Sequence, residues 1–192
     1  MGMFARRQGL ATSFARSIHS SLQDHPGAAS RLLQCYSITP ELDDQSALLR
    51  LLRFASDIGH QAAARTLAES FPGDVFLLEF SEPNPWDGPF TGHSTHILDI
   101  SFLLQNFNEH LDSTQRTSAE RFAQDVIMFV HGQQPWKPFS QSKGASRLEG
   151  GRRRYFEGPE ATTKRFRELL EIGKLVGLDT LFGLWVGFVF GA

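Results

Sequence analysis

The chain has 192 residues, of which 41% are hydrophobic and 21% charged, a composition typical of a soluble globular protein of one domain or of part of a larger one. Its formal net charge of -2 gives no broad electrostatic attraction to nucleic acid or to a membrane surface, so we expect no nucleic-acid partner. The single cysteine, Cys35, excludes an internal disulfide and a cysteine-based zinc site. We expect Cys35 to be a buried thiol on a helix.

The two ends of the chain resemble targeting and membrane segments only in part. Residues 1–22 contain arginines, several serines and no acidic residue, which is the composition of a mitochondrial transit peptide. An amphipathic surface helix has the same periodicity, and we favour it; without a secretory signal, the default compartment is the cytoplasm. Residues 175–192 are apolar but interrupted by Asp179, which is marginal for a membrane-spanning helix. We therefore predict a terminal helix docked on a core and no stable membrane span.

The first 70 residues predict a series of helices. Apolar residues recur at helical spacing in residues 12–24 and again in residues 28–36. Asp44 is placed to cap a helix that continues through Phe54. A separate helix is predicted from about residue 58 to residue 70.

Residues 75–80 are the clearest predicted strand, because they are short, nearly all apolar and bounded by turn residues. This pattern is typical of a strand that is buried on both faces of a mostly parallel sheet. Residues 153–156 are a weaker candidate for a second strand. The sequence shows no parallel partner for the first strand, and an unpaired strand leaves its backbone donors and acceptors unsatisfied. The chain is therefore expected to be a piece of a larger α/β fold, mostly helical with one or two buried strands.

Helices and loops fill the remainder of the predicted layout. A long irregular loop covers residues 81–95, and loops of this length are often functional. A helix is predicted over residues 97–107, and a second, capped by Ser113 or Thr114, runs to about His131. A charged helix is predicted from residue 160 to residue 174.

The loop after the predicted strand carries most of the chemically useful residues. Two histidines, two aspartates and a tryptophan lie between residues 84 and 99. The loops that leave the carboxyl ends of strands are the usual place for a site in an α/β sheet. The richest candidate site is therefore this loop, with His96 at its end.

The residues around His96 resemble the catalytic-histidine region of type-B carboxylesterases and lipases, a family of cholinesterase-like α/β-hydrolases. The order of glycine, histidine, an acid three positions later and then an apolar helix is matched by Gly92, His96, Asp99, Ile100, Phe102 and Leu103. Five further segments resemble the family. Asn84-Pro85-Trp86 and the run from Gln105 to Asn108 resemble its fungal branch, and the other three are Leu33 with Tyr36, Phe54 to Asp57, and Pro135-Trp136. The resemblance is clearest over residues 11–139.

This resemblance implies that residues 1–192 are a partial, C-terminal portion of an α/β-hydrolase domain that hydrolyses a small-molecule ester with no cofactor and no metal. In the family, a serine in a Gly-x-Ser-x-Gly turn attacks the ester, an acid orients a histidine, and the histidine is last in the chain. By this mapping His96 is the general base, while the serine and the acid are absent from the chain. We expect little activity in isolation and a pairing with the missing N-terminal part. The alternative is a non-catalytic interaction module or remnant that pairs with another chain.

Other interpretations of the same residues carry less weight. Residues 92–96 nearly match Gly-x-Ser-x-Gly, but the last position is histidine and no strand directly precedes it, so Ser94 is a weak candidate nucleophile. His93 and His96 are three residues apart and lack the spacing of a zinc helix. The run from Arg152 to Arg154 is expected to be a solvated face. Trp86 and Trp136 are expected to pack in the core or, alternatively, to line an acyl pocket.

Overall fold

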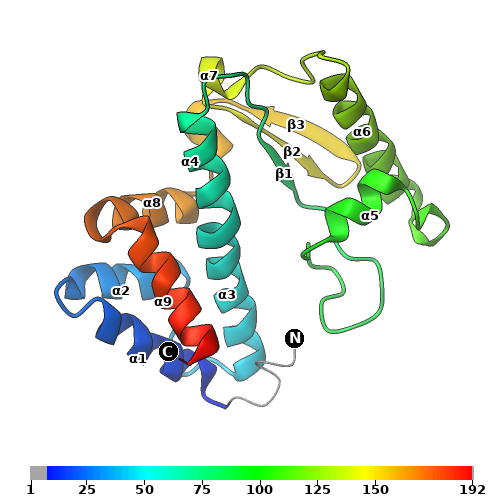
Figure 1. Cartoon of the computed structure of the whole chain (residues 1–192). Coiled ribbons are helices and arrows are strands. Elements are labelled where there is room, and N and C mark those ends of the chain that lie inside the picture. The colour runs from blue at the N-terminus through cyan, green and yellow to red at the C-terminus, as the bar shows by residue number, and fades with distance from the viewer. Residues whose placement is uncertain (1–7, 192) are drawn as a thin grey trace. The chain divides into compact units, whose positions relative to one another are not determined.

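The computed structural model describes residues 8–191, and it divides the chain into two compact units (Figure 1). The helical unit comprises the chain up to Thr66 and again from Thr162, coloured blue to cyan and orange to red. The sheet unit comprises Leu67–Ala161, coloured green to yellow. The described part of the chain is mostly helical with a small mixed sheet, which agrees with the expected class of a mostly helical α/β chain.

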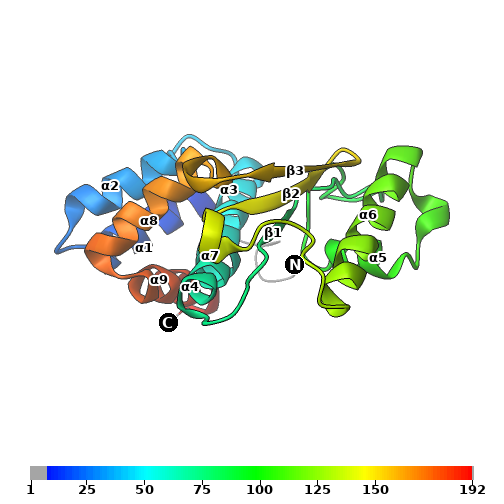
Figure 2. The same cartoon turned by 90° about the horizontal axis from the view of Figure 1, so that it is seen from above.

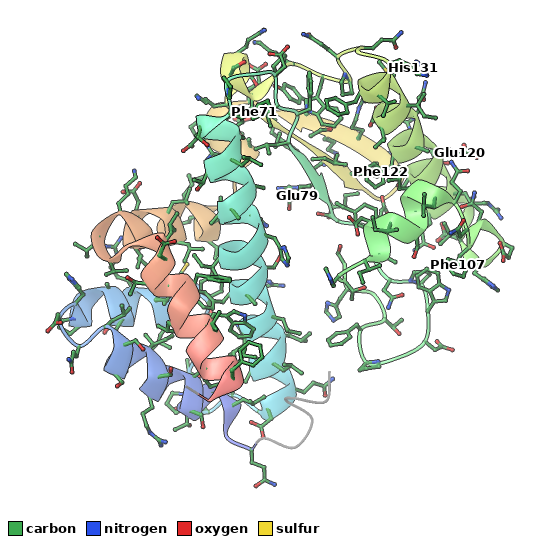
Figure 3. All side chains as sticks on the ribbon, viewed as in Figure 1. Phe71, Glu79, Phe107, Glu120, Phe122 and His131 are labelled. Carbon is green, nitrogen blue, oxygen red and sulfur yellow. The ribbon has the colours of Figure 1, made fainter. Side chains whose placement is uncertain are left out.

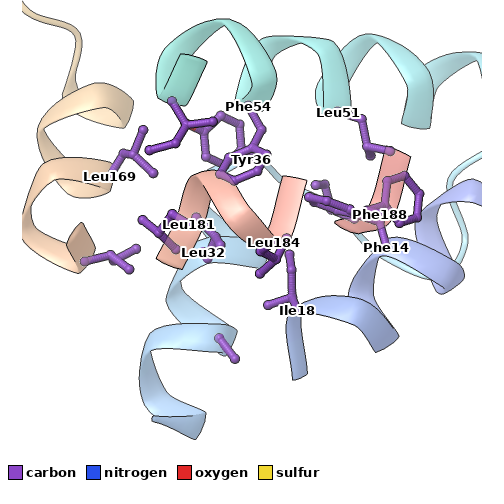
Figure 4. Packing of buried hydrophobic residues seen from close by; sticks show 14 of the residues in the cluster. Phe14, Ile18, Leu32, Tyr36, Leu51, Phe54, Leu169, Leu181, Leu184 and Phe188 are labelled. Atoms are coloured by element: carbon purple, nitrogen blue, oxygen red, sulfur yellow. The ribbon is translucent and has the colours of Figure 1, made fainter. Parts of the chain in front are cut away.

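The helical unit is built from helices that share one hydrophobic core. These are α1 (Leu10–Ser21), α2 (Pro26–Cys35), α3 (Asp44–Ser56), η1 (Asp57–Gln61), the start of α4 (Ala62–Ser70), α8 (Lys164–Val176) and α9 (Leu178–Phe190). Figure 4 shows the core between them, in which the largest fully buried side chains include Phe14, Ile18, Leu32, Leu51, Phe54, Leu169 and Leu181. This core brings together α1 and α9, which lie near opposite ends of the sequence. The rings of Phe14 and Phe188 lie 4.9 Å apart.

Helix α1 is an amphipathic helix of this core. It buries Leu10, Phe14 and Ile18, which are spaced four residues apart and therefore lie on one face. Residues 1–7, on which much of the transit-peptide interpretation depends, lie outside the described residues. The N-terminus of α1 is capped from a distance, because the backbone N–H of Leu10 donates to Asp44 at 2.8 Å. Asp43, and not Asp44, caps α3, so the predicted cap was wrong by one position.

A single long helix replaces the two separate helices that the sequence predicted between residues 44 and 70. Helix α3 continues through the π-helical turn η1 into α4, and the boundary between the two units falls within α4 (Figure 1). The π turn buries Asp57 and Ile58. A π turn inside an α-helix is rare and is frequently found at functional sites.

The C-terminal helix docks on the core, as the sequence predicted. Helix α9 buries Leu181, Leu184 and Phe188 against the helical core, while Phe190 stays exposed. In the described residues no single helix is long and apolar enough to cross a membrane. Helices α8 and α9 together reach that length and hydropathy, but they are bent by 102° relative to each other.

The sheet unit contains three strands in the order β1-β2-β3, seen side by side in Figure 2. Strand β1 (Leu78–Phe80) pairs in parallel with β2 (Ala145–Glu149), which pairs antiparallel with β3 (Arg152–Phe156). The prediction that the first strand has no parallel partner in this chain was therefore wrong. β1 is also shorter than predicted and only half-buried, and the sheet has three strands where one or two were expected.

The β2–β3 hairpin turns on Gly150 and Gly151, whose φ angles of 58° and 72° lie in the left-handed region. Two consecutive positive φ angles define the type I′ turn that matches the twist of a hairpin, and glycine adopts them without steric cost. The predicted strand at residues 153–156 is confirmed as β3.

Helices α5 (Leu98–Leu104) and α6 (Ser113–Val130) pack with the sheet to form a second core. Short turns accompany them, namely η2 (Asn108–His110), α7 (Phe139–Ser142) and η3 (Gly158–Ala161). The core contains Leu98, Phe102, Leu111, Ala119, Phe122 and Leu148. Asp112 caps α6 in a capping box with Gln115, one residue before the predicted cap.

Candidate functional site

The loop that carries His96 leaves the carboxyl end of β1, next to the parallel strand β2. The parallel register begins at Leu78 and Ser146, and the backbone N–H of Ser81 still donates to Leu148 of β2 at 2.9 Å. Beyond Ser81 the chain leaves the sheet, and the next regular element is α5. The loop that was predicted to carry the site therefore follows the carboxyl end of a strand, where the loops of α/β proteins often bind ligands.

Hydrogen bonds within the loop hold it closed at its base. The N–H of Asn84 donates to the carbonyl of His93 at 3.0 Å, and Gly92 donates to Asn84 at 2.9 Å. The Asn84 side chain accepts from the Trp86 N–H at 3.0 Å, and the Thr91 hydroxyl donates to the Trp86 carbonyl at 2.7 Å. Residues 84–93 therefore form a closed loop with its own internal bonding, a compact structure despite the absence of strands or helices.

His96 lies on the exposed side of the loop, immediately before a strained residue. Ile97 has a φ of 71°, which is unusual for a β-branched side chain, and it directly precedes α5. Asp99, in the first turn of α5, is half-buried, and no ion pair joins it to a described residue. Left-handed backbone at non-glycine residues costs free energy and is found most often at active sites and ligand clamps.

Ser94 occupies a position unlike that of a strained nucleophile turn. It is exposed, it lies far along the loop from β1, and its hydroxyl donates to the backbone carbonyl of Phe80 at 3.1 Å. A nucleophile elbow places the serine between a strand and a helix that follow one another directly. Here Thr95 to Ile97 separate Ser94 from α5, and no strand directly precedes it.

Glu82 is a buried acid at the base of the loop, which sequence reasoning did not single out. Its side chain is fully buried, and Oε1 accepts from the Ser118 hydroxyl of α6 and from the Gly151 N–H of the hairpin at 3.1 Å. The other oxygen, Oε2, has no hydrogen-bond partner among the described residues. Nothing in the local sequence signals this role, because it arises from three segments that are distant in the chain.

An apolar groove of about 510 Å³ lies within the sheet unit, between β1 and α6. Its wall includes aromatic and aliphatic side chains from α4, β1, α6 and the following loop, namely Leu67, Phe71, Phe76, Leu78, Phe80, Phe122, Val126, Phe129 and Trp136. Two of its lining residues, Phe71 and Phe122, are labelled in Figure 3. Asp74, Asp99 and Asp125 are the acids at this groove.

Trp136 lines the groove, so the sequence-based alternative of a pocket-lining tryptophan fits its position. Its indole Nε1 is buried and has no hydrogen-bond partner among the described residues, and its ring lies 5.9 Å from the Arg153 guanidinium. Arg153 also forms an ion pair with Asp125. Burial raises the pKa of the Asp125 carboxyl, although the Arg153 cation opposes that shift. Arg152, Arg153 and Arg154 are all exposed, as expected, and Arg153 in addition pairs with Asp125.

A second polar cluster lies in the helical unit around the π turn. The Asp57 carboxylate accepts from Arg165 and from the Tyr36 hydroxyl, the latter at 2.8 Å. Burial, followed by the Asp57 charge, raises the pKa of Tyr36. Cys35 is half-buried on α2, its thiol donates to the Arg165 carbonyl, and burial raises its pKa to about 11. A thiol that stays protonated in this way is a poor nucleophile.

The described residues contain no group of three or more histidine, cysteine, aspartate or glutamate side chains placed to hold a metal ion. Comparison with known protein families, with curated proteins and with solved structures found no match. The resemblance to type-B carboxylesterases therefore remains a prediction from the residues that carry it.

Proposed function

We propose that the chain is the C-terminal portion of a carboxylic-ester hydrolase of the type-B carboxylesterase/lipase kind, with His96 as its general base. The observation that carries the proposal is the position of His96, which lies three residues beyond the closed loop of residues 84–93, in the segment that follows the carboxyl end of β1. The strained backbone of Ile97, directly after it, adds support.

In this proposal His96 takes the proton of a serine hydroxyl while that oxygen attacks the ester carbonyl. The same imidazole then returns the proton to the departing alcohol, and water repeats the cycle to release the acid. An imidazole can do both, because one ring nitrogen accepts the proton and later donates it. Asp99 is not assigned as the orienting acid, because it is only three residues away on the first turn of α5.

The serine, the orienting acid and the oxyanion donors would come from another segment. Loss of the nucleophile lowers the rate of such enzymes by several orders of magnitude, so we expect little hydrolysis by this chain alone. The purified chain should fail to react with a fluorophosphonate probe and should not turn over p-nitrophenyl esters. Labelling of Ser94 with turnover that His96→Ala abolishes would overturn this expectation and establish an independent enzyme.

A complementation experiment tests His96 directly. The chain would be co-expressed with a type-B carboxylesterase truncated just before its own histidine loop. We expect the pair to regain fluorophosphonate labelling and esterase turnover, and His96→Ala to remove both. His93→Ala is the matched control, because His93 is an exposed histidine of the same loop and should leave both intact. A stable complex that stays inactive, or one that His96→Ala does not impair, would contradict the proposal.

A non-catalytic interaction module is the second candidate. The observation in its favour is the set of large apolar side chains that stay exposed in the sheet unit, which include Leu67, Phe71, Ile100, Leu104, Phe129 and Val130. Large exposed apolar side chains mark a surface that binds other proteins where they lie side by side. Co-purification with an esterase that lacks this region would support it, whereas a monodisperse, cooperatively folding monomer would count against it.

A further inference from the structure

One edge of β1 has no strand beside it among the described residues. Alternate residues of this segment bond to β2, since the carbonyl of Leu77 accepts from Ser146 and the N–H of Ser81 donates to Leu148. The backbone groups of Leu78 and Phe80 therefore point to the opposite edge. On that side, Ser94 Oγ bonds to the carbonyl of Phe80, and no other described group bonds to these two residues. An open edge of this kind is a template for a further strand.

Strand β1 also lines the apolar groove. Leu78 and Phe80 project their side chains into it, as successive same-face residues of a strand do. Phe71 and Phe129, which line the groove, are 53% and 54% exposed, so they are not satisfied by packing within the sheet unit. The edge supplies hydrogen bonds and the groove supplies apolar surface, which together are the two parts of a strand-addition site.

The charge of the groove indicates what kind of segment it accepts. Asp74 and Asp99 line it, and neither forms an ion pair with a described residue; Asp74 accepts only from Gln134, at 3.4 Å. The third acid, Asp125, is already paired with Arg153. An apolar segment that carries a lysine or arginine is therefore the complementary occupant.

We propose that the open edge of β1 and the groove beside it bind an extended segment of another polypeptide, with apolar side chains on one face and a basic residue that meets Asp74 or Asp99. The inference does not depend on ester chemistry: a chain that binds such a segment and fails the complementation test keeps this site and loses the proposed activity.

The test uses the full chain and a short acetylated peptide that alternates valine with threonine and has lysine at both ends. Binding is measured by fluorescence anisotropy, and hydrogen exchange at the amides of Leu78 and Phe80 is followed by NMR. We expect binding to slow exchange at both amides. A peptide with glutamate in place of lysine should bind about fivefold more weakly, because the charge attraction becomes a repulsion. A peptide with a central proline should lose the protection.

Variants of the groove provide the matched control. Phe71→Asp and Phe129→Asp should each weaken peptide binding about tenfold, because apolar contact is lost and acidic charge is added. Val130→Asp and Phe190→Asp alter residues that are 73% and 71% exposed and lie outside the groove, so binding should not change. All four side chains are largely exposed, and circular dichroism checks that each variant is folded.

Four outcomes would overturn the proposal. Unchanged exchange at Leu78 and Phe80 would show that no strand adds at this edge. Equal binding of the lysine and glutamate peptides would show that the groove has no charge preference. A dimer in solution that Phe129→Asp dissociates would identify a second copy as the occupant. Binding of a small apolar dye without any peptide binding would identify a small-molecule pocket instead.

Discussion

Arg165 and Asp57 form a bidentate ion pair across the helical unit, with the Arg165 Nε 2.7 Å from Oδ2 and a second guanidinium nitrogen 3.2 Å from Oδ1. Asp57 is buried, and Arg165 is partly buried. The pair joins the π turn η1 to α8, which are more than one hundred residues apart in the chain. This contact places the C-terminal helices against the N-terminal ones.

Removing one partner of that pair should destabilise the helical unit strongly. Arg165→Leu leaves a buried carboxylate without its cation, and we expect the free energy of unfolding to fall by about 3–5 kcal/mol. Tyr36→Phe removes one hydrogen bond to the same carboxylate and should cost about 1.5–3 kcal/mol. Urea unfolding measures both. The control is Arg31→Ala, since Arg31 pairs with Glu168 at the surface and should contribute less than about 1 kcal/mol. An Arg165→Leu effect no larger than that of the control would contradict the structural role.

Cys35 should make the stability of the helical unit depend on alkaline pH. Burial, with a contribution from Glu168, raises the pKa of its thiol from an ordinary 9.0 to about 11. The neutral thiol is therefore favoured by folding, and its contribution is full below about pH 9 and is lost as the pH rises towards 11. We expect the melting temperature of the native chain to fall further between pH 8 and pH 10 than that of Cys35→Ala. Parallel pH profiles of the two proteins would refute this.

Asp43 and Asp44 cap two different helices, although they are adjacent in sequence. Asp43→Ala removes the cap of α3, and Asp44→Ala removes the acceptor for the N–H groups of Gly9 and Leu10 at the start of α1. Each should cost about 1 kcal/mol. Hydrogen exchange separates them, since only Asp44→Ala should increase exchange at Leu10. If both variants instead affect the amide of Ser46 and neither affects α1, then Asp44 does not cap α1.

The two hairpin glycines should differ in their tolerance of substitution. A Cβ at Gly151 would lie 2.9 Å from Cγ2 and 3.1 Å from the carbonyl oxygen of Thr114, whereas a Cβ at Gly150 meets open space. Gly151→Ala combines left-handed strain with this clash and should cost about 2 kcal/mol or more. Gly150→Asn should change the free energy of unfolding by only a few tenths of a kcal/mol, because asparagine tolerates the left-handed region. Thermal unfolding of the two variants tests this; equal losses would argue against the packing of the hairpin on α6.

Glu82 should hold the base of the His96 loop. Glu82→Ala removes the acceptor of two buried donors and should lower the free energy of unfolding by about 3 kcal/mol. Ser118→Ala keeps the bond from the Gly151 N–H and should cost only about 1 kcal/mol. We also expect the NMR signal of the His96 ring to shift in Glu82→Ala and to stay in place in Ser118→Ala. An unchanged His96 signal in both would mean that Glu82 does not influence the loop.

Local sequence patterns predicted most of the helices, because helical periodicity depends only on residues three or four positions apart. Phe14 and Ile18 are spaced for one face of α1, and the apolar residues after Asp179 are those that α9 buries. The helix ends were less accurate, since the cap residues Asp43 and Asp112 stand beside other residues that can also cap. The boundary between two helices near Asp57 was wrong, because a π turn is continuous with the helix around it.

The pairing of the strands and the burial of Glu82 depend on contacts between distant segments of the chain. The sequence by itself determined the mostly helical character, the first strand and the loop that presents His96, since each depends on residues within one window. Only the tertiary structure placed β2 beside β1 and brought Ser118 and Gly151 to Glu82, because a backbone hydrogen bond or a buried carboxylate selects partners by proximity in space. The open edge of β1 is also a feature that only the tertiary structure reveals, because a strand edge is open or paired according to which strands lie beside it.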